Sequence, residues 1–101
     1  MIAKILIKRR FREGNTSQII TILNDIRRLA MSWSGYQSGE TLTKNGFPND
    51  MVVISTWNSM EEWQAWKACT ERKKFEAMLE VYQVGPTEYE EYLLGSPLHR
   101  P

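Results

Sequence analysis

The chain has 101 residues, of which 42% are hydrophobic and 25% charged, and its formal net charge is +1. This composition is ordinary for a soluble globular protein, and the length predicts one domain with a single core. No apolar run approaches the ~20 residues that cross a bilayer, and "MIAKILIKRR" lacks the charge order of a signal peptide. We therefore expect no membrane partner and a cytoplasmic location.

Cys69 and His99 are the only residues of their types. A single cysteine forms neither an intrachain disulfide nor a CxxC metal or redox motif, and it fits a reducing compartment. A single histidine close to the C-terminus excludes a histidine-rich metal site. Cys69 itself is interpreted as a small hydrophobic helix residue rather than a reactive thiol.

The first half of the chain predicts a strand followed by a helix. Residues alternate from Ile2 to Phe11, which favours a strand with Ala3, Ile5 and Ile7 on one face. Asn15 is the predicted helix N-cap, with Gln18 three residues later in a capping-box arrangement. The apolar residues that follow recur at helical spacing, namely Ile19, Ile22, Leu23, Ile26, Leu29 and Ala30. Asp25, Arg27 and Arg28 are placed on the wet side, and the helix should end near residues 32–35.

Two strands and a turn are predicted next. Tyr36 to Lys44 is interpreted as a strand, and "NGFPND" (residues 45–50) as a turn cluster. Met51 to Trp57, "MVVISTW", is the strongest strand signal because it begins as an almost continuous apolar run rich in β-branched residues. A strand that is apolar on both faces requires cover on both faces.

The second half predicts further helix and a last strand. Ser59 with Glu62 forms an S-x-x-E capping box, and Met60, Trp63 and Trp66 then lie along one side. Thr70 is a candidate cap for a fresh helical segment, in which apolar residues resume at helical spacing as Phe75, Met78, Leu79 and Tyr82. "VGP" ends that helix, Thr87 to Leu94 predicts a strand, and residues 96–101 are expected to be a loose tail after one domain of residues 1–95.

The order β-α-β-β-α-β predicts an α+β, ferredoxin-like fold, with two helices on one face of a four-stranded antiparallel sheet. Residues 1–33 carry seven Lys/Arg and two acids, whereas residues 34–101 carry six and ten. Because the first and last strands are neighbours in this fold, we expect internal pairing across them. The predicted pairs join Lys4, Lys8 and Arg10 to Glu88, Glu90 and Glu91.

The other face of the sheet has no helix to cover it. An exposed apolar face of this size marks an interface, and a second copy packed sheet against sheet is the simplest cover. The sequence therefore predicts a two-fold homodimer.

The segment "VISTWNSMEEWQAW" resembles the antibiotic biosynthesis monooxygenase (ABM) family, together with "GYQSGETL" before it and "FEAMLEVY" after it. The resemblance extends from Ile2 to about Leu94. It implies a dimeric α/β barrel and a pocket between the helices and the sheet. It also implies that Trp66 presses against a bound aromatic, that Trp63 is an aromatic core position, and that Trp57 ends the third strand.

The family includes cofactor-independent monooxygenases of polycyclic phenols, quinol oxidases and haem-degrading enzymes. Haem-degrading members carry an asparagine on the first strand, where this chain has Ile7, and an iron-binding histidine after the position of Trp66. The segment "KACTERKKFEAMLEVY" contains no histidine. Without an axial nitrogen ligand, haem degradation of that kind is rejected, and weak haem binding through Trp66 is the haem-related alternative that stays open.

Large aromatic residues at helical spacing are usually core. Trp63 is therefore predicted to be core, Trp66 to line a pocket, and Trp57 to serve either role. Four polar residues near these segments complete the candidate substrate-binding set: Asn58, Tyr36, Arg72 and Tyr82. Arg72 suits an oxyanion, although its setting in "TERKK" favours a solvated face. The tyrosines favour packing with a wet hydroxyl, and no residue is identified as catalytic.

The sequence thus predicts a homodimer that oxidises a small electron-rich aromatic or quinol with O₂, without metal, flavin or other cofactor. The alternative is a non-catalytic ligand-binding module of the same fold. A third interpretation is a basic-patch binder that uses Arg9, Arg10, Arg12, Arg27 and Arg28. The aromatic motif of RNA-binding sheets is missing and the pI is near 8, so we expect no nucleic-acid partner.

Overall fold

The computed structural model describes residues 1–95. Within them the elements follow the order β1 (Ala3–Arg10), α1 (Thr16–Ala30), β2 (Tyr36–Lys44), β3 (Phe47–Trp57), α2 (Met60–Lys67), α3 (Thr70–Glu80) and β4 (Glu88–Leu93). The predicted α+β, ferredoxin-like fold is confirmed. The second helical region consists of two helices rather than one, so three helices cover the sheet. The predicted loose tail and His99 lie outside the described residues.

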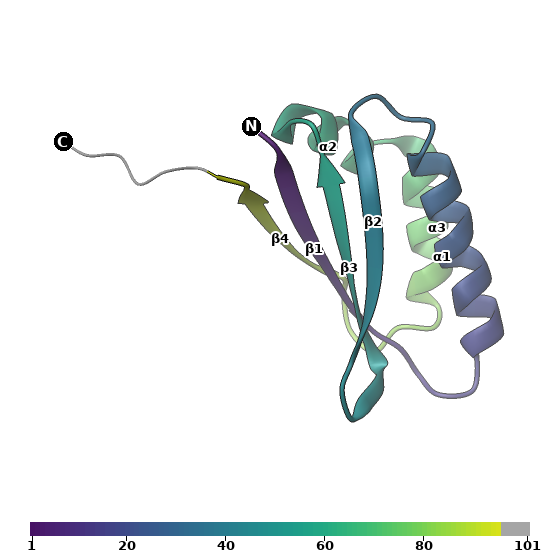
Figure 1. Ribbon diagram of the computed structural model, residues 1–101. Coiled ribbons are helices and arrows are strands. Elements are labelled where there is room, and N and C mark those ends of the chain that lie inside the picture. The colour runs from purple at the N-terminus through teal and green to yellow at the C-terminus, as the bar shows by residue number, and fades with distance from the viewer. Residues whose placement is uncertain (96–101) are drawn as a thin grey trace.

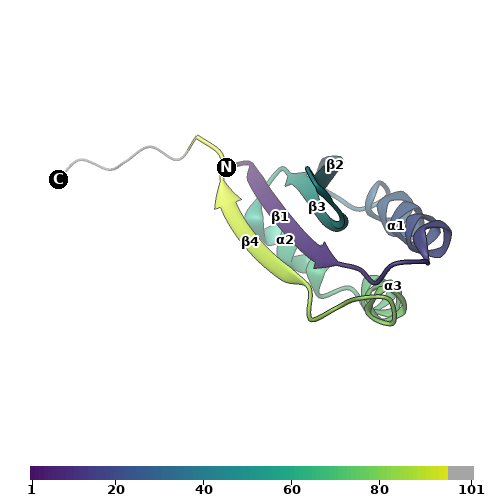
Figure 2. The same ribbon diagram turned by 90° about the horizontal axis from the view of Figure 1, so that it is seen from below.

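The four strands form one antiparallel sheet in the order β2-β3-β1-β4, so the first and last strands are neighbours as predicted. Figures 1 and 2 show α1 and α3 side by side on one face of this sheet, with α2 near the end that holds the N-terminus. The other face carries no helix among residues 1–95. The sheet therefore has a helix-covered inner face and an open outer face.

Alternation along β1 sends Ala3, Ile5, Ile7 and Arg9 to the inner face, where all four are buried. The main core cluster adds Ala30 and three tryptophans, Trp57, Trp63 and Trp66. A second cluster forms where α1 packs on α3, and its buried members are Phe11, Ile19, Ile22 and Leu79. The helical spacing of α1 is thus explained, because its apolar stripe faces both the sheet and α3.

The two predicted capping boxes differ in outcome. Ser59 caps α2: its Oγ accepts a hydrogen bond from the Glu62 backbone N–H at 3.2 Å and donates to Glu62 Oε1 at 2.9 Å. Asn15 occupies the N-cap position of α1, but its side chain makes no capping hydrogen bond. The predicted Asn15–Gln18 box is therefore wrong, although the helix starts where it was expected.

Local boundaries also depart from prediction. β3 begins at Phe47 rather than Met51, because only Asn45 and Gly46 form the turn, with Gly46 at a φ of 81°. Cys69, and not Thr70, is the N-cap of α3. On α3, Met78 is 49% exposed instead of packing with its predicted stripe. The inward face of α3 is formed by Arg72, Glu76 and Leu79, so the apolar stripe that was predicted from Phe75 is rotated away from it at Met78.

The predicted charge pairing across β1 and β4 is partly wrong. Lys8 Nζ lies 3.0 Å from Glu90 Oε1, as the charge pattern indicated. Arg10 instead pairs with Asp50 on β3 at 3.0 Å, and Lys4 lies opposite Tyr92. Glu91 points to the inner face, because β4 places it opposite Ile5.

None of the helices in residues 1–95 is long and apolar enough to cross a membrane.

Candidate functional site

A cavity of about 40 Å³ lies between the inner face of the sheet and the helices. Three strands form its floor and the three helices its roof. Its lining residues are Ile7, Arg9, Tyr36, Gly39, Thr41, Val53 and Ser55 from the strands, and Leu23, Ile26, Arg27, Ala30, Trp66, Arg72 and Glu76 from the helices. The cavity is smaller than the roughly 300–1,000 Å³ typical of ligand pockets.

The two ends of this cavity differ in exposure. At the edge between α1 and β2, Thr41 is exposed, and Arg27, Tyr36 and Gly39 are half-buried. We call this edge the mouth. Arg9, Ser55, Trp66, Arg72 and Glu76 are buried and form the inner end. The cavity therefore leads from solvent at the mouth to charged residues in the core.

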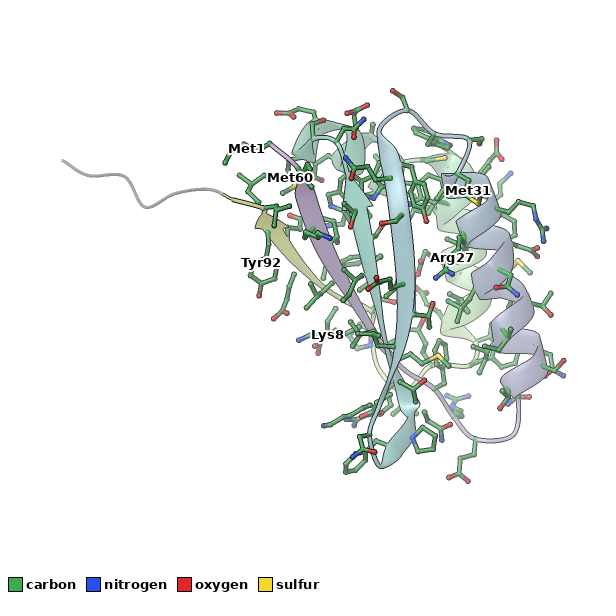
Figure 3. The ribbon with its side chains drawn as sticks, in the orientation of Figure 1. Met1, Lys8, Arg27, Met31, Met60 and Tyr92 are labelled. Atoms are coloured by element: carbon green, nitrogen blue, oxygen red, sulfur yellow. The ribbon has the colours of Figure 1, made fainter. Side chains whose placement is uncertain are left out.

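A hydrogen bond crosses the mouth. Arg27 Nη2 on α1 donates to Thr41 Oγ1 on β2 at 2.7 Å, and Figure 3 shows Arg27 reaching from α1 into the gap beside β2. Gly39 lies directly below, where a Cβ would stand 2.7 Å from the Tyr36 hydroxyl and 3.4 Å from Arg27 Nε. The absence of a side chain at Gly39 thus leaves room for Tyr36 and Arg27 at the mouth. Arg27 was predicted on the wet side of its helix; it is half-buried, and its hydrogen bond to Thr41 lies at the exposed edge of the cavity.

The Tyr36 phenol is the one cavity group with a clear electrostatic perturbation. Burial raises its pKa above the ordinary value of 10.0, and the positive charge of Arg27 partly opposes that shift. Tyr36 is therefore a neutral phenol at physiological pH, able to donate one hydrogen bond and to accept others.

At the inner end, two arginines share one carboxylate. Arg9 Nη2 and Arg72 Nη2 both donate to Glu76 Oε1, the latter at 3.2 Å. The side chains of Arg9, Arg72 and Glu76 are only 3%, 4% and 8% exposed. We call these three residues the buried ionic cluster.

Aromatic and backbone groups fix the position of Arg72. Its Nη2 also donates to the Tyr89 hydroxyl at 2.7 Å, and its Nη1 donates to the Lys67 carbonyl at 3.4 Å. The guanidinium lies 5.6 Å from the Trp63 ring centroid and 5.4 Å from that of Tyr89. The prediction of a solvated Arg72 is therefore wrong. On α3, residues 72, 76 and 79 share the face turned toward the sheet.

The tryptophans form a continuous aromatic array. Trp66 stacks on Trp57 with centroids 6.1 Å apart, and Trp33 meets Trp66 edge-on at 5.5 Å. Trp57 also lies 6.2 Å from Trp63. One face of Trp66 is thus occupied by Trp57, and Trp66 lines the cavity while only 2% exposed. Trp33 lies outside the tryptophan segment on which the family resemblance was based.

The structure brings three of the seven predicted site residues to the cavity: Trp66, Tyr36 and Arg72. Trp57 and Trp63 are fully buried behind the cavity wall. Their indole N–H groups donate to Ser55 Oγ and Glu91 Oε2, at 2.8 and 2.6 Å. Asn58 is exposed and accepts a hydrogen bond from Gln37. Tyr82 packs on the second core cluster, away from the cavity.

Arg9 and Glu76 are cavity residues that sequence reasoning missed. Arg9 continues the alternation of Ala3, Ile5 and Ile7, so period two alone puts it on the inner face. Glu76 follows Arg72 by four residues, the spacing that puts two side chains on one helix face. Both signals were in the sequence, but charged residues are by default assigned to the surface.

Within residues 1–95 no group of three or more His, Cys, Asp or Glu side chains is arranged to hold a metal ion.

The fold and the cavity define a ferredoxin-like α+β protein whose potential ligand site lies between the helices and the sheet. The family model for antibiotic biosynthesis monooxygenase matches residues 2–78, and this chain belongs to that family. The family resemblance read from the tryptophan segment is thereby confirmed. A search of curated protein sequences gives no match.

Solved structures agree on the fold at low sequence identity. A conserved protein from Methanosarcina mazei Go1 superposes with a TM-score of 0.84 at 10% identity, covering 91% of each chain. SnoaB, a cofactor-independent oxygenase from Streptomyces nogalater, gives 0.82 at 11% identity over 98% of each chain. Rv0793 from Mycobacterium tuberculosis gives 0.80 at 11% identity, covering 99% of this chain and 98% of its own.

Proposed function

We propose that this protein is a cofactor-independent monooxygenase or quinol oxidase that acts on a small electron-rich aromatic with O₂. The observation that carries the proposal is the cavity itself, in which one wall is Trp66 and the inner end holds Arg9 and Arg72. An aromatic wall suits a flat ring, and buried cations suit the anion of a phenol or quinol. Family membership and the structural likeness to SnoaB support the same class of reaction.

In this reaction the main contribution of the protein is a set of polar groups fixed in advance around the substrate. A phenol or hydroquinone loses a proton to water at the mouth, and the resulting electron-rich anion reduces O₂. A quinol is then oxidised to the quinone with release of hydrogen peroxide, whereas a monooxygenated substrate keeps one oxygen atom and the other leaves as water. The protein stabilises that anion by fixed positive charge and excludes water from it. Arg72 is suited to the first task because its guanidinium is immobilised by Glu76, Tyr89 and Lys67.

The size of the cavity determines how such a substrate enters. A volume of about 40 Å³ holds small groups but no complete bicyclic ring. In our proposal the substrate enters between α1 and β2, breaks the Arg27–Thr41 hydrogen bond, and leaves part of its ring in the mouth. This side chain–side chain hydrogen bond on an exposed edge is easily broken, because the net stabilisation from such a bond is only about 1 kcal/mol.

We further propose that the protein is a homodimer through its outer sheet face. Leu6, Leu42, Val52 and Ile54 lie together there by the register of β1, β2 and β3, and Leu42 is 48% exposed. Figure 3 shows Lys8 and Tyr92 on the side of the sheet away from the helices. A groove of about 650 Å³ lies on this face beside the β2–β3 hairpin, and side chains of a second copy would fill it.

The small cavity also supports the second candidate, a non-catalytic binding module for a small aromatic ligand. A module that holds and releases a ligand does not need to enclose it. The two candidates differ in turnover and share the same cavity, so one assay separates them.

The arginines that suggested a basic patch are already engaged. Arg9 is buried against Glu76, whereas Arg10 and Arg28 pair with Asp50 and Asp25. Arg12 donates to the Val81 carbonyl and Arg27 to Thr41. Our proposal therefore includes no nucleic-acid partner. It places the protein in the cytoplasm, on the ground of composition and the lone cysteine.

The test is O₂ consumption by the purified protein against a panel of anthrones, hydroquinones and naphthoquinols. Trp66→Phe removes part of the cavity wall with less loss of packing than Trp66→Ala, which would cost about 3–5 kcal/mol. Trp33→Phe is the matched control, because Trp33 touches Trp66 without lining the cavity. We expect uptake above the spontaneous rate, reduced in Trp66→Phe and retained in Trp33→Phe.

Absence of uptake with every compound, by a protein that still binds them, would contradict the oxygenase and leave the binding module. Equal loss in both variants would contradict the assignment of Trp66 to the cavity.

A further inference from the structure

The buried ionic cluster carries an uncompensated charge. Arg9 and Arg72 contribute two guanidinium groups, which stay protonated in proteins, and Glu76 contributes one carboxylate. One positive charge is therefore left over at the inner end of the cavity. Tyr89, the other side chain that binds Arg72, offers a hydroxyl oxygen as acceptor rather than a carboxylate. Removing an unbalanced charge from water is costly unless a partner compensates it.

Each member of the cluster also keeps an unused hydrogen-bonding atom. Arg9 Nε, Arg72 Nε and Glu76 Oε2 are buried and have no hydrogen-bond partner among the described residues. Buried polar groups without partners are rare in folded proteins and call for an explanation. Two of the three unused atoms, Arg9 Nε and Arg72 Nε, are donors on cationic groups. An oxyanion forms its strongest hydrogen bonds with donors of this kind.

These atoms belong to side chains that line the cavity. Arg9, Arg72 and Glu76 are all cavity residues, so a ligand that enters by the mouth meets them at the far end. The remaining charged residue of the cavity lining is Arg27 at the mouth, which is also positive and donates to the neutral Thr41. The summed charge of the cavity lining is therefore positive and favours an anion.

We propose that the Arg9–Glu76–Arg72 cluster is a subsite for one ionised oxygen of an aromatic ligand. Arg9 and Arg72 pair with that oxyanion, and Glu76 holds the two guanidinium groups together until it arrives. A second hydroxyl on the ligand would find an acceptor in Glu76 Oε2. The proposal depends on the proposed function in one respect, namely that the ligand is a substrate. Binding of the anion itself requires no turnover.

A purely structural role is the competing explanation. A buried Arg–Glu–Arg triad can simply join β1 to α3, and such a triad needs no ligand. The two explanations differ for Glu76→Gln, which keeps the shape of the side chain and removes its charge. The substitution raises the net positive charge of the cluster by one. If the cluster is a subsite, anion binding therefore tightens. If the cluster is only structural, the variant loses stability and gains no affinity for anions.

The experiment uses calorimetric titration with three inert probes of similar size. 4-Nitrophenol is studied above the pH at which it ionises, 4-nitrobenzoate supplies a carboxylate, and 4-nitroanisole is neutral. We expect the wild-type protein to bind an anionic probe about tenfold or more tightly than the anisole, since hydrogen bonds to charged groups are the stronger ones. Preference between nitrophenolate and nitrobenzoate distinguishes a phenolate subsite from a carboxylate subsite.

Variants then assign the effect to the cluster. Glu76→Gln is expected to tighten binding of the preferred anion several-fold, and Arg72→Gln to abolish its advantage over the anisole. Arg28→Gln is the matched control, because this arginine is on α1 with a side chain 77% exposed. Circular dichroism verifies folding of each variant, and the wild-type probe series stands even where a variant fails to fold.

Equal affinity for the anionic and neutral probes, or no binding of either anion, would overturn the proposal. So would weaker anion binding in a folded Glu76→Gln. These failures are distinct from failure of the oxygenase, because O₂ uptake without anion preference would remove the subsite alone, and anion preference without O₂ uptake would remove the oxygenase alone.

Discussion

At the scale of single residues, the candidate site depends on charged side chains that are buried, although a charged residue is ordinarily predicted to lie in solvent. Arg9, Arg72 and Glu76 are all buried. Alternation on β1 indicates the inner face for Arg9, and the i, i+4 spacing indicates a shared face for Arg72 and Glu76. Which face of α3 turns inward depends on the break at Ala68 and Cys69. The ionic cluster was therefore beyond what sequence patterns could establish.

Tyr36 provides a prediction at this scale. Its folded-state pKa is raised above 10.0, chiefly because burial disfavours the phenolate. The folded protein thus holds this proton more tightly than the unfolded chain does. The stability that the neutral phenol contributes is fully present below pH 10.0 and is lost as the pH rises through the folded-state pKa.

Absorbance titration of the phenolate checks this expectation. We expect Tyr36 to ionise above pH 10.0 in the folded protein, and Tyr36→Phe to remove that late step. Tyr92→Phe is the control, since Tyr92 is 51% exposed. Lys8 also has a raised pKa, through its hydrogen bond to Glu90 and then the charge of that residue, but a lysine contributes nothing to phenolate absorbance. A late step that persists in Tyr36→Phe would contradict the burial of this phenol.

At the scale of elements, the order and type of strands and helices could be predicted because hydrophobic period reports local structure directly. The ends were less accessible. "FPND" reads as turn, yet it continues β3, since Phe47 pairs with Lys44 directly across the two-residue turn. The α2–α3 break at "KACT" carries no proline or glycine, and the predicted cap at Thr70 falls one residue after the observed N-cap, Cys69.

The helix caps give a prediction for these elements. Ser59→Ala removes the hydrogen bond to the Glu62 backbone N–H and is expected to lower the free energy of unfolding by about 1 kcal/mol. Asn15→Ala is the matched comparison, because the Asn15 side chain makes no capping bond. It should cost only a few tenths of a kcal/mol. Urea denaturation measures both, and equal losses would contradict the difference between the two caps.

At the scale of the whole molecule, the ferredoxin-like fold leaves one sheet face without helices, and we propose that a second copy covers it. The outer-face residues Leu6, Val52 and Ile54 were predictable from the apolar run of β3 and its register with β1. The second copy that the sequence predicts as their cover stays a prediction, because the structure contains one chain.

Leu42→Glu tests the dimer. It places a charge within the proposed interface, on a side chain already 48% exposed in the single chain, so the fold should survive. Val81→Glu is the control, since Val81 is 65% exposed just beyond α3. Sedimentation should find a dimer for the wild type and the control and a monomer for Leu42→Glu. A wild-type monomer at all concentrations would contradict the proposed interface.

The central claim is that the cavity between α1 and β2 receives the aromatic substrate. A crystal structure of the protein with a naphthoquinol, prepared without O₂ to prevent turnover, tests it most directly. We predict the ligand ring in the mouth against Trp66, with one oxygen toward Arg9 and Arg72 and the Arg27–Thr41 bond broken. A ligand held in the groove of the outer sheet face, with the inner cavity unchanged, would contradict the account.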